Sequence, residues 1–474
     1  MRVSDGKPLK NRRGKRKPAS AKSAPDTGHA TRALVLCPVL GRTDRATVNG
    51  GPSRGTNESS AARTLQSEAR LTEAIGLAKA IDLDVRGEGF VPITRPRPAT
   101  LFGSGKVEEL TGLVRAEDAG LVIVDHALSP VQQRNLERAW GTKVLDRTGL
   151  ILEIFGRRAR TNEGRLQVEL AHLTYQKSRL VRSWTHLERQ RGGFGFLGGP
   201  GETQIESDRR VIQDRITAIH KELERVKRTR GLHRQSRERV PYPVVALVGY
   251  TNAGKSTLFN LLTGADVSAQ NLLFATLDPT MREVSLPGRG RIILSDTVGF
   301  ISELPTTLIA SFRATLEEVV EADLLLHVRD MSDPNCESQR ADVEHVLSAL
   351  GIDAGDEERP LLEVWNKIDL LDEAELEHAV NSASRSGGNA VCISAATGEG
   401  MTDLLLATQD RIDASHEMLD FELDTKNGAL INWVHENSEV LARHESGPTR
   451  YRYSVRISAE KKSKLMRRLE AQAN

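Results

Sequence analysis

The sequence predicts an α/β fold that is spread over several domains. Its 474 residues exceed the usual size of one domain and suggest about three. From Arg32 to about Gly156, short apolar runs alternate with amphipathic helical stretches, which is typical of an α/β domain. Further along, the apolar run Val244–Val248 leads directly into a glycine-rich loop and then a helical stretch. A buried strand that feeds such a loop predicts a second α/β domain, of the P-loop class.

The glycine-rich loop reads Gly-Tyr-Thr-Asn-Ala-Gly-Lys-Ser and matches the phosphate-binding pattern G-x-x-x-x-G-K-[ST]. Its backbone N–H groups and the N-terminus of the following helix would point at one anion. Lys255 would reach the β- and γ-phosphates, and the Ser256 hydroxyl would bind Mg²⁺. The residues expected around the phosphates are Gly249, Tyr250, Thr251, Asn252, Ala253, Gly254, Lys255 and Ser256.

A second motif, Asn366-Lys367-Ile368-Asp369, indicates which base is bound. The Asp369 carboxylate can accept hydrogen bonds from N1–H and the N2 amine of guanine, and the Asn366 amide can donate to N7. Adenine lacks this pair of donors, and a buried polar group left unpaired discriminates by roughly 10⁴-fold. Ser394, Ala395 and Ala396 would complete the pocket, with the Ala395 N–H as a donor to guanine O6. The sequence therefore predicts GTP rather than ATP.

Two segments between these motifs are expected to sense the γ-phosphate. In Asp296-Thr297-Val298-Gly299, Asp296 would hold Mg²⁺ through a water molecule, and the Gly299 N–H would contact the γ-phosphate. In Phe274-Ala275-Thr276-Leu277-Asp278, Thr276 would give Mg²⁺ a second hydroxyl only while GTP is bound, with Thr280 as the alternative. The candidate catalytic residues are Lys255, Thr276 and Gly299, and the candidate Mg²⁺ ligands are Ser256, Thr276 and Asp296.

The residue after Gly299 is Phe300, at the position where Ras-like enzymes place a glutamine that orients the attacking water. An apolar side chain cannot align water, so we expect slow hydrolysis by the protein alone. Asn252 offers one way to complete the site, since some relatives of this GTPase class use an asparagine there to help hold K⁺. The competing interpretation is that Asn252 only tolerates a left-handed turn.

Composition argues against several other classes. The stretch Met1–Ala30 is strongly basic with few apolar residues, which predicts a disordered tail that either contacts phosphate backbones or is simply solvated. The sequence shows no secretion signal and no stretch long enough to span a bilayer. Three separated cysteines without metal-ligand spacing suit a reducing cytosol. We expect a cytoplasmic protein, with peripheral membrane association as the alternative.

The N-terminal α/β domain is expected to contain strands at Ala33–Val39 and Leu121–Asp125. Leu71, Ile75, Ala78 and Ile81 form a helical stripe between them. The segment Gly103-Ser104-Gly105-Lys106 resembles half of a phosphate loop but lacks its full spacing. It is interpreted as a turn that starts a helix, with an accessory nucleotide site as the minority hypothesis.

Two long, charged segments, Thr161–Gln190 and Glu202–Arg234, flank a glycine-rich stretch that contains Phe194, Phe196 and Leu197. They predict an antiparallel helical hairpin whose tip inserts its aromatic residues into a partner, for instance by stacking on unpaired bases. The alternative is a flexible linker whose aromatics pack back on the helices. Apolar residues at helical spacing are Leu166, Leu170, Leu173, Ile205, Val211, Ile212, Ile216, Ile219 and Leu223.

Basic residues gather at the two ends of the predicted hairpin, which fits contact with RNA phosphates. Near the tip they are Arg179, Arg182, Arg189, Arg191, Arg209 and Arg210. At the other end they are Lys227, Arg228, Arg230, Arg234, Arg237 and Arg239.

Together these features resemble the HflX family of ribosome-associated GTPases. The resemblance rests on the stretch Asp146–Phe155, which reads DRTGLILEIF, on Gly199–Gln204, on the nucleotide motifs and on Asp296–Ile301. It covers nearly everything from Arg32 onward. It implies a GTPase that binds the 50S ribosomal subunit and its rRNA and can dissociate ribosomes, with the hairpin reaching toward the peptidyl-transferase centre. Many members read roughly G-G-x-G-T-R-G-P-G-E at the tip, whereas here Phe196-Leu197-Gly198 replaces the Thr-Arg portion with one extra residue.

The fold class expected is therefore α/β, with a P-loop GTPase domain preceded by an α/β N-terminal domain with a long helical hairpin, plus a small α+β C-terminal domain. The expected bounds are a basic tail at 1–30, the N-terminal domain at 31–160, the hairpin at 161–239, the GTPase domain at 240–412 and the C-terminal domain at 413–474. In the last, we expect a helix near Gly428–Ala442, a strand at Arg450–Ile457 and a basic helix from Ala459 to Leu469.

Two rival functions are left open by the sequence. One is a ribosome-assembly GTPase that uses GTP as a timer. The other is a regulatory GTPase switch that acts on a protein or membrane partner. In each case we expect a monomer without stable insertion into a membrane.

Overall fold

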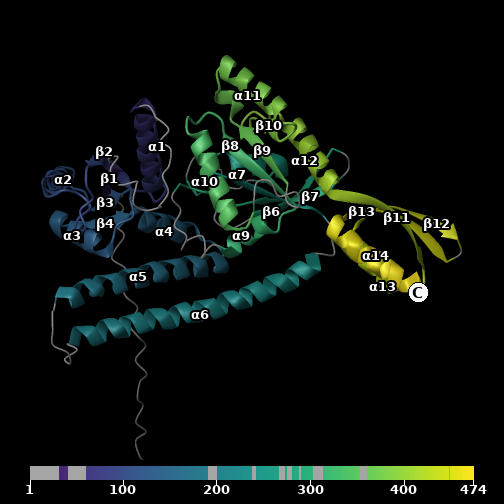
Figure 1. Ribbon diagram of the computed structural model, residues 1–474, viewed down its shortest axis with the longest axis horizontal. Helices are drawn as coiled ribbons and strands as arrows, with labels where there is room; N and C mark the ends of the chain where they lie inside the picture. The colour runs from purple at the N-terminus through teal and green to yellow at the C-terminus, as the bar shows by residue number, and fades with distance from the viewer. Residues whose placement is uncertain are drawn as a thin grey trace, which may run out of the picture. The chain divides into compact units, whose positions relative to one another are not determined.

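The computed structural model of the protein describes residues 31–40, 60–190, 200–237, 242–265, 273–274, 280–287, 290–302, 313–352, 360–447 and 449–473 (Figure 1). The predicted basic tail and the hairpin tip with Phe194, Phe196 and Leu197 lie outside these residues. Within them, no helix is both long and apolar enough to cross a membrane.

A four-stranded parallel sheet, ordered β2-β1-β3-β4, forms the N-terminal α/β fold. Its central strands are runs of buried apolar residues because helices cover both faces. Helices α1 and α4 pack on one face, and α2 and α3 on the other. The elements are β1 (Arg32–Leu40), α1 (Ser60–Lys79), β2 (Asp84–Ile93), α2 (Ser104–Ala116), β3 (Leu121–Val124), α3 (Pro130–Trp140), β4 (Lys143–Asp146) and α4 (Arg147–Arg158).

The sequence predictions for this fold are largely confirmed. β1 and β3 match the two predicted strands, and Leu71, Ile75 and Ala78 lie on the side of α1 that packs on the sheet. The predicted stripe also included Ile81, which is buried just beyond the end of α1. Gly103 precedes the first residue of α2, and Lys106 Nζ pairs with Glu109 Oε1 at 2.7 Å. This segment starts a helix, as predicted.

The hairpin consists of α5 (Asn162–Gln190) and α6 (Pro200–Arg237), close to the predicted bounds. Leu166, Leu170, Ile216 and Ile219 form their buried apolar seam, with Leu173, Ile212 and Leu223 packed against it. Val211 was predicted to join this seam, but it is 64% exposed. It lies about 100° around the helix from Ile212, so it faces away from α5.

The predicted GTPase domain has a six-stranded sheet ordered β10-β9-β8-β5-β7-β6, in which only β6 is antiparallel. The carboxyl ends of the parallel strands therefore meet at one edge, where ligands bind in such sheets. The elements are β5 (Val244–Gly249), α7 (Lys255–Thr263), β6 (Thr280–Ser285), β7 (Arg291–Asp296), α9 (Arg313–Val320), β8 (Leu324–Asp330), α10 (Cys336–Ala349), β9 (Leu361–Asn366), the short 3₁₀ helix Ile368–Leu370, α11 (Glu373–Arg385), β10 (Ala390–Cys392) and α12 (Met401–Ser415).

The C-terminal region is a three-stranded antiparallel sheet, ordered β11-β13-β12, with two helices packed on it. Its elements are β11 (His416–Asp424), α13 (Gly428–Asn437), β12 (Glu439–Gly447), β13 (Arg450–Ser458) and α14 (Ala459–Ala473). The helix predicted to reach Ala442 was too long, because Val440 pairs with Val455 in the sheet and the chain becomes β12. Strand β11 was not predicted. Its alternating apolar residues Leu419, Phe421 and Leu423 pack around the fully buried Tyr453.

Candidate active site

The phosphate loop follows β5 and opens helix α7, as the sequence predicts. Gly254 has a φ of 97°, in the left-handed region that favours glycine. A Cβ atom there would lie 2.1 Å from Asn366 Nδ2, so no larger residue fits. Asn252 also has a left-handed φ of 62°. This conformation agrees with the turn interpretation of Asn252 and leaves the K⁺ hypothesis untested.

Lys255 lies buried beneath this loop. Its Nζ donates to the carbonyl oxygens of Gly249 at 3.1 Å and Tyr250 at 2.6 Å. Burial lowers the pKa of Lys255 from 10.5 to about 8, although the nearby Asp296 carboxylate opposes this shift. A phosphate beside the ammonium group would favour its charged form.

The two predicted Mg²⁺ ligands within the described residues lie side by side. Ser256 Oγ, at the start of α7, donates to Asp296 Oδ2, at the end of β7, over 2.8 Å. Mg²⁺ prefers oxygen ligands and usually keeps several waters, so one or two protein groups suffice. The pair therefore fits this ion.

The segment after Asp296 approaches the phosphate loop closely. A Cβ atom on Gly299 would lie 3.0 Å from Thr251 Cα and 3.1 Å from Lys255 Nζ, which leaves room only for glycine. Phe300 N donates to Gly249 O at 3.1 Å, and Thr251 N donates to Phe300 O at 2.7 Å. These bonds place the Gly299 backbone directly over the loop, where the sequence predicts a γ-phosphate contact.

The side chain of Phe300 turns away from this site. It is 1% exposed and belongs to an apolar core that includes Phe274 and Val298. A phenylalanine side chain has no polar atom that could orient water, as the sequence indicates. The Thr297 hydroxyl is engaged by the backbone of β5, since it donates to Leu247 O at 2.5 Å.

The guanine motif lies at the carboxyl end of β9. Asn366 is buried, its Nδ2 donates to Ala253 O at 2.8 Å, and its Oδ1 accepts from Ala395 N at 2.9 Å. The Ala395 N–H, predicted to donate to guanine O6, is thus engaged by Asn366 in this structure. Asp369 is exposed, and Ser394 Oγ donates to its Oδ1 at 2.6 Å. One carboxylate oxygen of Asp369 is therefore oriented while the other stays available for a base.

One further residue, Asp330, supports this motif and was missed from the sequence. Lys367 has a left-handed φ of 65°, and its Nζ pairs with Asp330 Oδ2 at 2.6 Å. Asp330 is the last residue of β8, and it pairs with Asn366 at the end of the neighbouring strand β9. Its place at the end of a predicted strand could have indicated this role. Ile368 is buried. Ala396 follows Ala395 in the loop after β10.

The segment predicted to sense the γ-phosphate beside β6 is described only in part. Ala275, Thr276, Leu277 and Asp278 lie outside the described residues, so their roles stay predictions. Phe274 has a left-handed φ of 58° and packs edge-to-face on Phe155 of α4, with ring centroids 4.7 Å apart. The alternative to Thr276, Thr280, is the first residue of β6 and pairs with Asp296 in the sheet.

A phosphate loop after the central strand, an aspartate at the end of the neighbouring strand and a base-reading motif at the same edge define a P-loop GTP-binding protein. Four family profiles match the chain. Those described as "GTP-binding GTPase N-terminal" and "GTP-binding GTPase Middle Region" match residues 68–156 and 158–237. Those described as "50S ribosome-binding GTPase" and "HflX C-terminal domain" match residues 244–367 and 379–474.

Individual relatives cover most of the chain. GTPase HflX of Magnetococcus marinus is 51% identical over 377 residues, 79% of this chain and 85% of the relative. GTPase HflX of Escherichia coli K12 is 49% identical over 335 residues, 71% of this chain and 77% of the relative. A GTP-binding protein of Sulfolobus solfataricus, solved in complex with GDP, aligns over 80% of this chain and 98% of its own, with 22% identity and a TM-score of 0.42. The chain belongs to the HflX GTPase family, and it hydrolyses GTP.

The orientation of Asp369 leads to a prediction about base choice. Asp369→Asn places an amide donor opposite the guanine N1–H and N2 donors, so GTP affinity should fall about fivefold or more and XTP should become preferred, because one mispaired polar group in a base pocket costs about 1–3 kcal/mol. Competition of GTP and XTP against a fluorescent GDP analogue measures this. Asp372→Asn, the same change at the exposed cap of α11, is the matched control and should leave base preference intact. Unchanged preference in Asp369→Asn would rule out Asp369 as the base reader.

The low pKa of Lys255 leads to a prediction about protons. In the folded, nucleotide-free protein Lys255 is largely neutral at pH 8.5, and bound phosphates restore its charge, so binding should take up roughly half a proton or more. Calorimetric titration with GDP at pH 8.5, in two buffers of different ionisation enthalpy, measures the uptake. Lys255→Arg is always charged and should show less uptake under saturating conditions. Equal proton uptake by the unchanged protein and by Lys255→Arg would show that a group other than Lys255 takes up the proton.

The same shift affects folding with a definite sign. Because the folded pKa of Lys255 lies below its ordinary value, the unfolded chain binds more protons between about pH 8 and 10.5. The contribution of Lys255 to the stability of the nucleotide-free protein therefore rises with pH through this window.

Proposed function

We propose that this GTPase binds the 50S ribosomal subunit through its rRNA and dissociates ribosomes in a nucleotide-dependent manner. The observation that carries the proposal is the α5–α6 hairpin. Helix α6 has 38 residues, which corresponds to a length of roughly 57 Å. The apolar seam between the two helices runs from Leu166 to Leu173 on α5 and from Ile212 to Leu223 on α6. On the tip side of this seam, residues 206–210 of α6 are exposed, and the profile name "50S ribosome-binding GTPase" supports a ribosomal partner.

The charges of the hairpin support rRNA contact in part. Arg209 and Arg210 are exposed on α6 and suit phosphate contacts. Arg179 was predicted to do the same, but this is wrong. Its guanidinium donates to Asp146 Oδ2 at 2.6 Å and stacks on Tyr175, 4.1 Å from the ring centroid. Its side chain is only 17% exposed and holds α5 to the N-terminal sheet.

The basic helix α14 contributes less than its composition suggests. Lys462 pairs with Glu417, and the Arg468 guanidinium lies 4.9 Å from the Trp433 ring centroid. Lys461, Lys464 and Arg467 complete its set of basic residues. The exposed basic residues of the hairpin therefore support an RNA partner more strongly than those of α14 do.

In the proposed reaction, Ser256, Thr276 and Asp296 would hold Mg²⁺, and the ion would neutralise charge on the β- and γ-phosphates. Lys255 stabilises the same charge, because its ammonium group lies at the loop floor, where water is excluded. The Gly299 N–H, which lies close to Thr251 and Lys255, would hold the γ-phosphate. None of these groups activates the attacking water, and Phe300 does not either. We therefore propose that contact with the ribosomal subunit orders the remaining part of the site.

K⁺ is a second proposed means of completing the site. Asn252 lies in the phosphate loop, where an ion would sit beside the phosphates and add positive charge in the transition state. Hydrolysis should be slow in isolation, rise strongly with 50S subunits, and be faster in K⁺ than in Na⁺ buffer. Single-turnover rates in the four combinations test this. Equal rates in both salts would remove the role of Asn252, and fast hydrolysis without 50S subunits would remove the need for an activator.

We further propose that the protein acts as a cytoplasmic monomer. Sedimentation of 70S ribosomes, with the protein and a non-hydrolysable GTP analogue, distinguishes the proposed function from its rivals. Conversion to subunits supports dissociation. Binding only to immature particles indicates an assembly role, and no binding to any ribosomal particle indicates a switch for another partner.

The hairpin tip provides the sharpest variant for this test. Replacing Phe194, Phe196 and Leu197 with Ser should leave GTP affinity intact and reduce dissociation by about a hundredfold, because each lost base-stacking aromatic costs roughly 1–3 kcal/mol. Arginines near the loop should still hold the protein on the subunit in a salt-sensitive way. Normal dissociation by the triple variant would show that the tip is a linker.

A further inference from the structure

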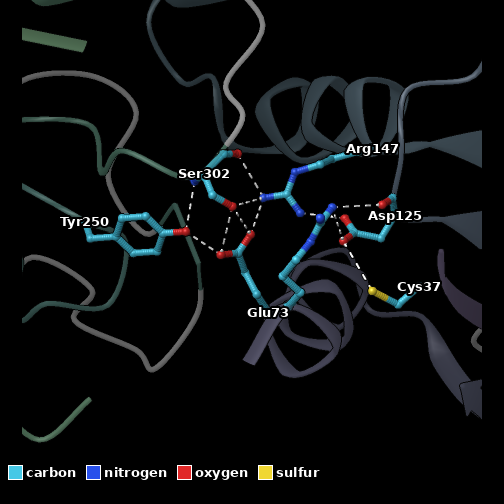
Figure 2. A network of polar contacts seen from close by, with 7 residues as sticks. Cys37, Glu73, Asp125, Arg147, Tyr250 and Ser302 are labelled. Carbon is cyan, nitrogen blue, oxygen red and sulfur yellow. Dashed lines mark hydrogen bonds and ion pairs between the residues drawn. The ribbon is translucent and has the colours of Figure 1, made fainter. Parts of the chain in front are cut away.

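Open parallel sheets bind ligands at a point that is set by their strand order. This point lies at the carboxyl ends of the strands where the strand order reverses, which here is between β1 and β3. Asp125 directly follows β3 and is 1% exposed. Cys37 of β1, Arg70 of α1 and Arg147 of α4 contact Asp125. Glu73 of α1 pairs with Arg147, and Ser302 of the GTPase domain joins these two residues (Figure 2).

Arg147 connects the two domains. Its side chain is 4% exposed, and its Nη1 donates to Asp125 Oδ1 at 2.5 Å. Its Nη2 pairs with Glu73 and donates to Ser302, to the carbonyl oxygen at 3.0 Å and to Oγ at 2.9 Å. Burial opposes the charge, but the Glu73 and Asp125 carboxylates outweigh it and raise the pKa of Arg147 above its ordinary value. The guanidinium therefore stays charged, with its donors in fixed directions.

Tyr250 reaches the same network from the phosphate loop (Figure 2). Its hydroxyl accepts from Ser302 N at 2.9 Å and donates to Glu73. Burial and the Glu73 carboxylate raise the pKa of Tyr250 well above its ordinary value, so this hydroxyl remains a donor. The N–H, the carbonyl and the hydroxyl of Ser302 are all engaged, and three residues from different parts of the chain fix its position.

The position of Ser302 matters because it follows Gly299 by three residues. Phe300, between them, is bonded to the phosphate loop, so the backbone is held on both sides of Ile301. The other γ-phosphate segment rests on the same two helices. Phe274 packs on Phe155 of α4, and Leu273 lies 3.1 Å from the position of a Cβ atom on Gly76 of α1.

We propose that Arg147 is a positioning residue for GTP hydrolysis, which acts through Ser302 to hold the Gly299 N–H at the γ-phosphate, with Glu73 and Tyr250 completing the support. GDP has no γ-phosphate and makes no use of this N–H. Loss of the network therefore affects the triphosphate and its hydrolysis, and it leaves the binding of GDP unchanged.

Arg147→Met keeps the aliphatic stem and removes the hydrogen bonds. Single-turnover GTP hydrolysis without ribosomes should slow about tenfold or more, since hydrogen bonds to charged groups are worth about 1.5–3 kcal/mol. Affinity for a non-hydrolysable GTP analogue should also fall, while GDP affinity stays within about twofold. Arg157→Met is the matched control, because Arg157 lies on the same helix and contacts only Ile81 and Asp82 of its own domain in the described hydrogen bonds. It should change neither rate nor affinity.

Tyr250→Phe removes a contact of the network from the side of the GTPase domain. It tests the proposal independently if Arg147→Met fails to fold. It should give the same pattern, and the double variant should be no slower than the slower single one, because both changes remove one shared support. Arg147→Lys keeps the charge and should restore part of the rate. Equal losses of GDP and GTP-analogue affinity would reduce Arg147 to a structural role. Faster hydrolysis by either variant, or additive losses in the double variant, would overturn the proposal.

Discussion

The nucleotide site depends on the buried amide of Asn366. It donates to Ala253 in the phosphate loop and accepts from Ala395 in the loop after β10, over 2.8 and 2.9 Å. Three loops that are far apart in the sequence are therefore joined by one side chain that is 1% exposed. Both ends of the amide are satisfied, so its orientation is fixed, and loss of either partner would leave a buried polar group unpaired. Gly254 is required at the loop because the amide nitrogen occupies the space of a Cβ atom.

Much of this site could be predicted from the sequence, because its chemistry depends on short motifs at strand ends. The loop Gly249–Ser256 and the pair Ser256 and Asp296 lie where strand, loop and helix order predicts them. The two hairpin helices were equally predictable, since long apolar periodicity identifies a helix with little dependence on the rest of the fold. The C-terminal strands β11 and β12 were less predictable than β13. The helix predicted from the sequence extended through Glu439 to Ala442, and only pairing with β13 makes these residues part of a strand.

Contacts between distant side chains could not be predicted in this way. Arg147 and Ser302 are 155 positions apart, and nothing in the spacing of either indicates the other. Arg179 shows the same limit in reverse. Its place among other arginines suggested an exposed, RNA-facing side chain, yet it is paired with Asp146. Composition shows how many charged residues a segment contains, but the fold determines which of them form ion pairs within the protein.

The start of helix α4 carries two attachments on consecutive residues. Asp146 caps the helix and receives hydrogen bonds from Tyr175 and Arg179 of the hairpin, at 2.5 and 2.6 Å. Arg147 holds Ser302 of the GTPase domain. Their Cα atoms are only about 3.8 Å apart along a rigid peptide unit. No flexible chain lies between them that could absorb movement. The base of the hairpin and the backbone near the γ-phosphate position are thus connected in series, and neither can be displaced without moving α4 or breaking one of these contacts.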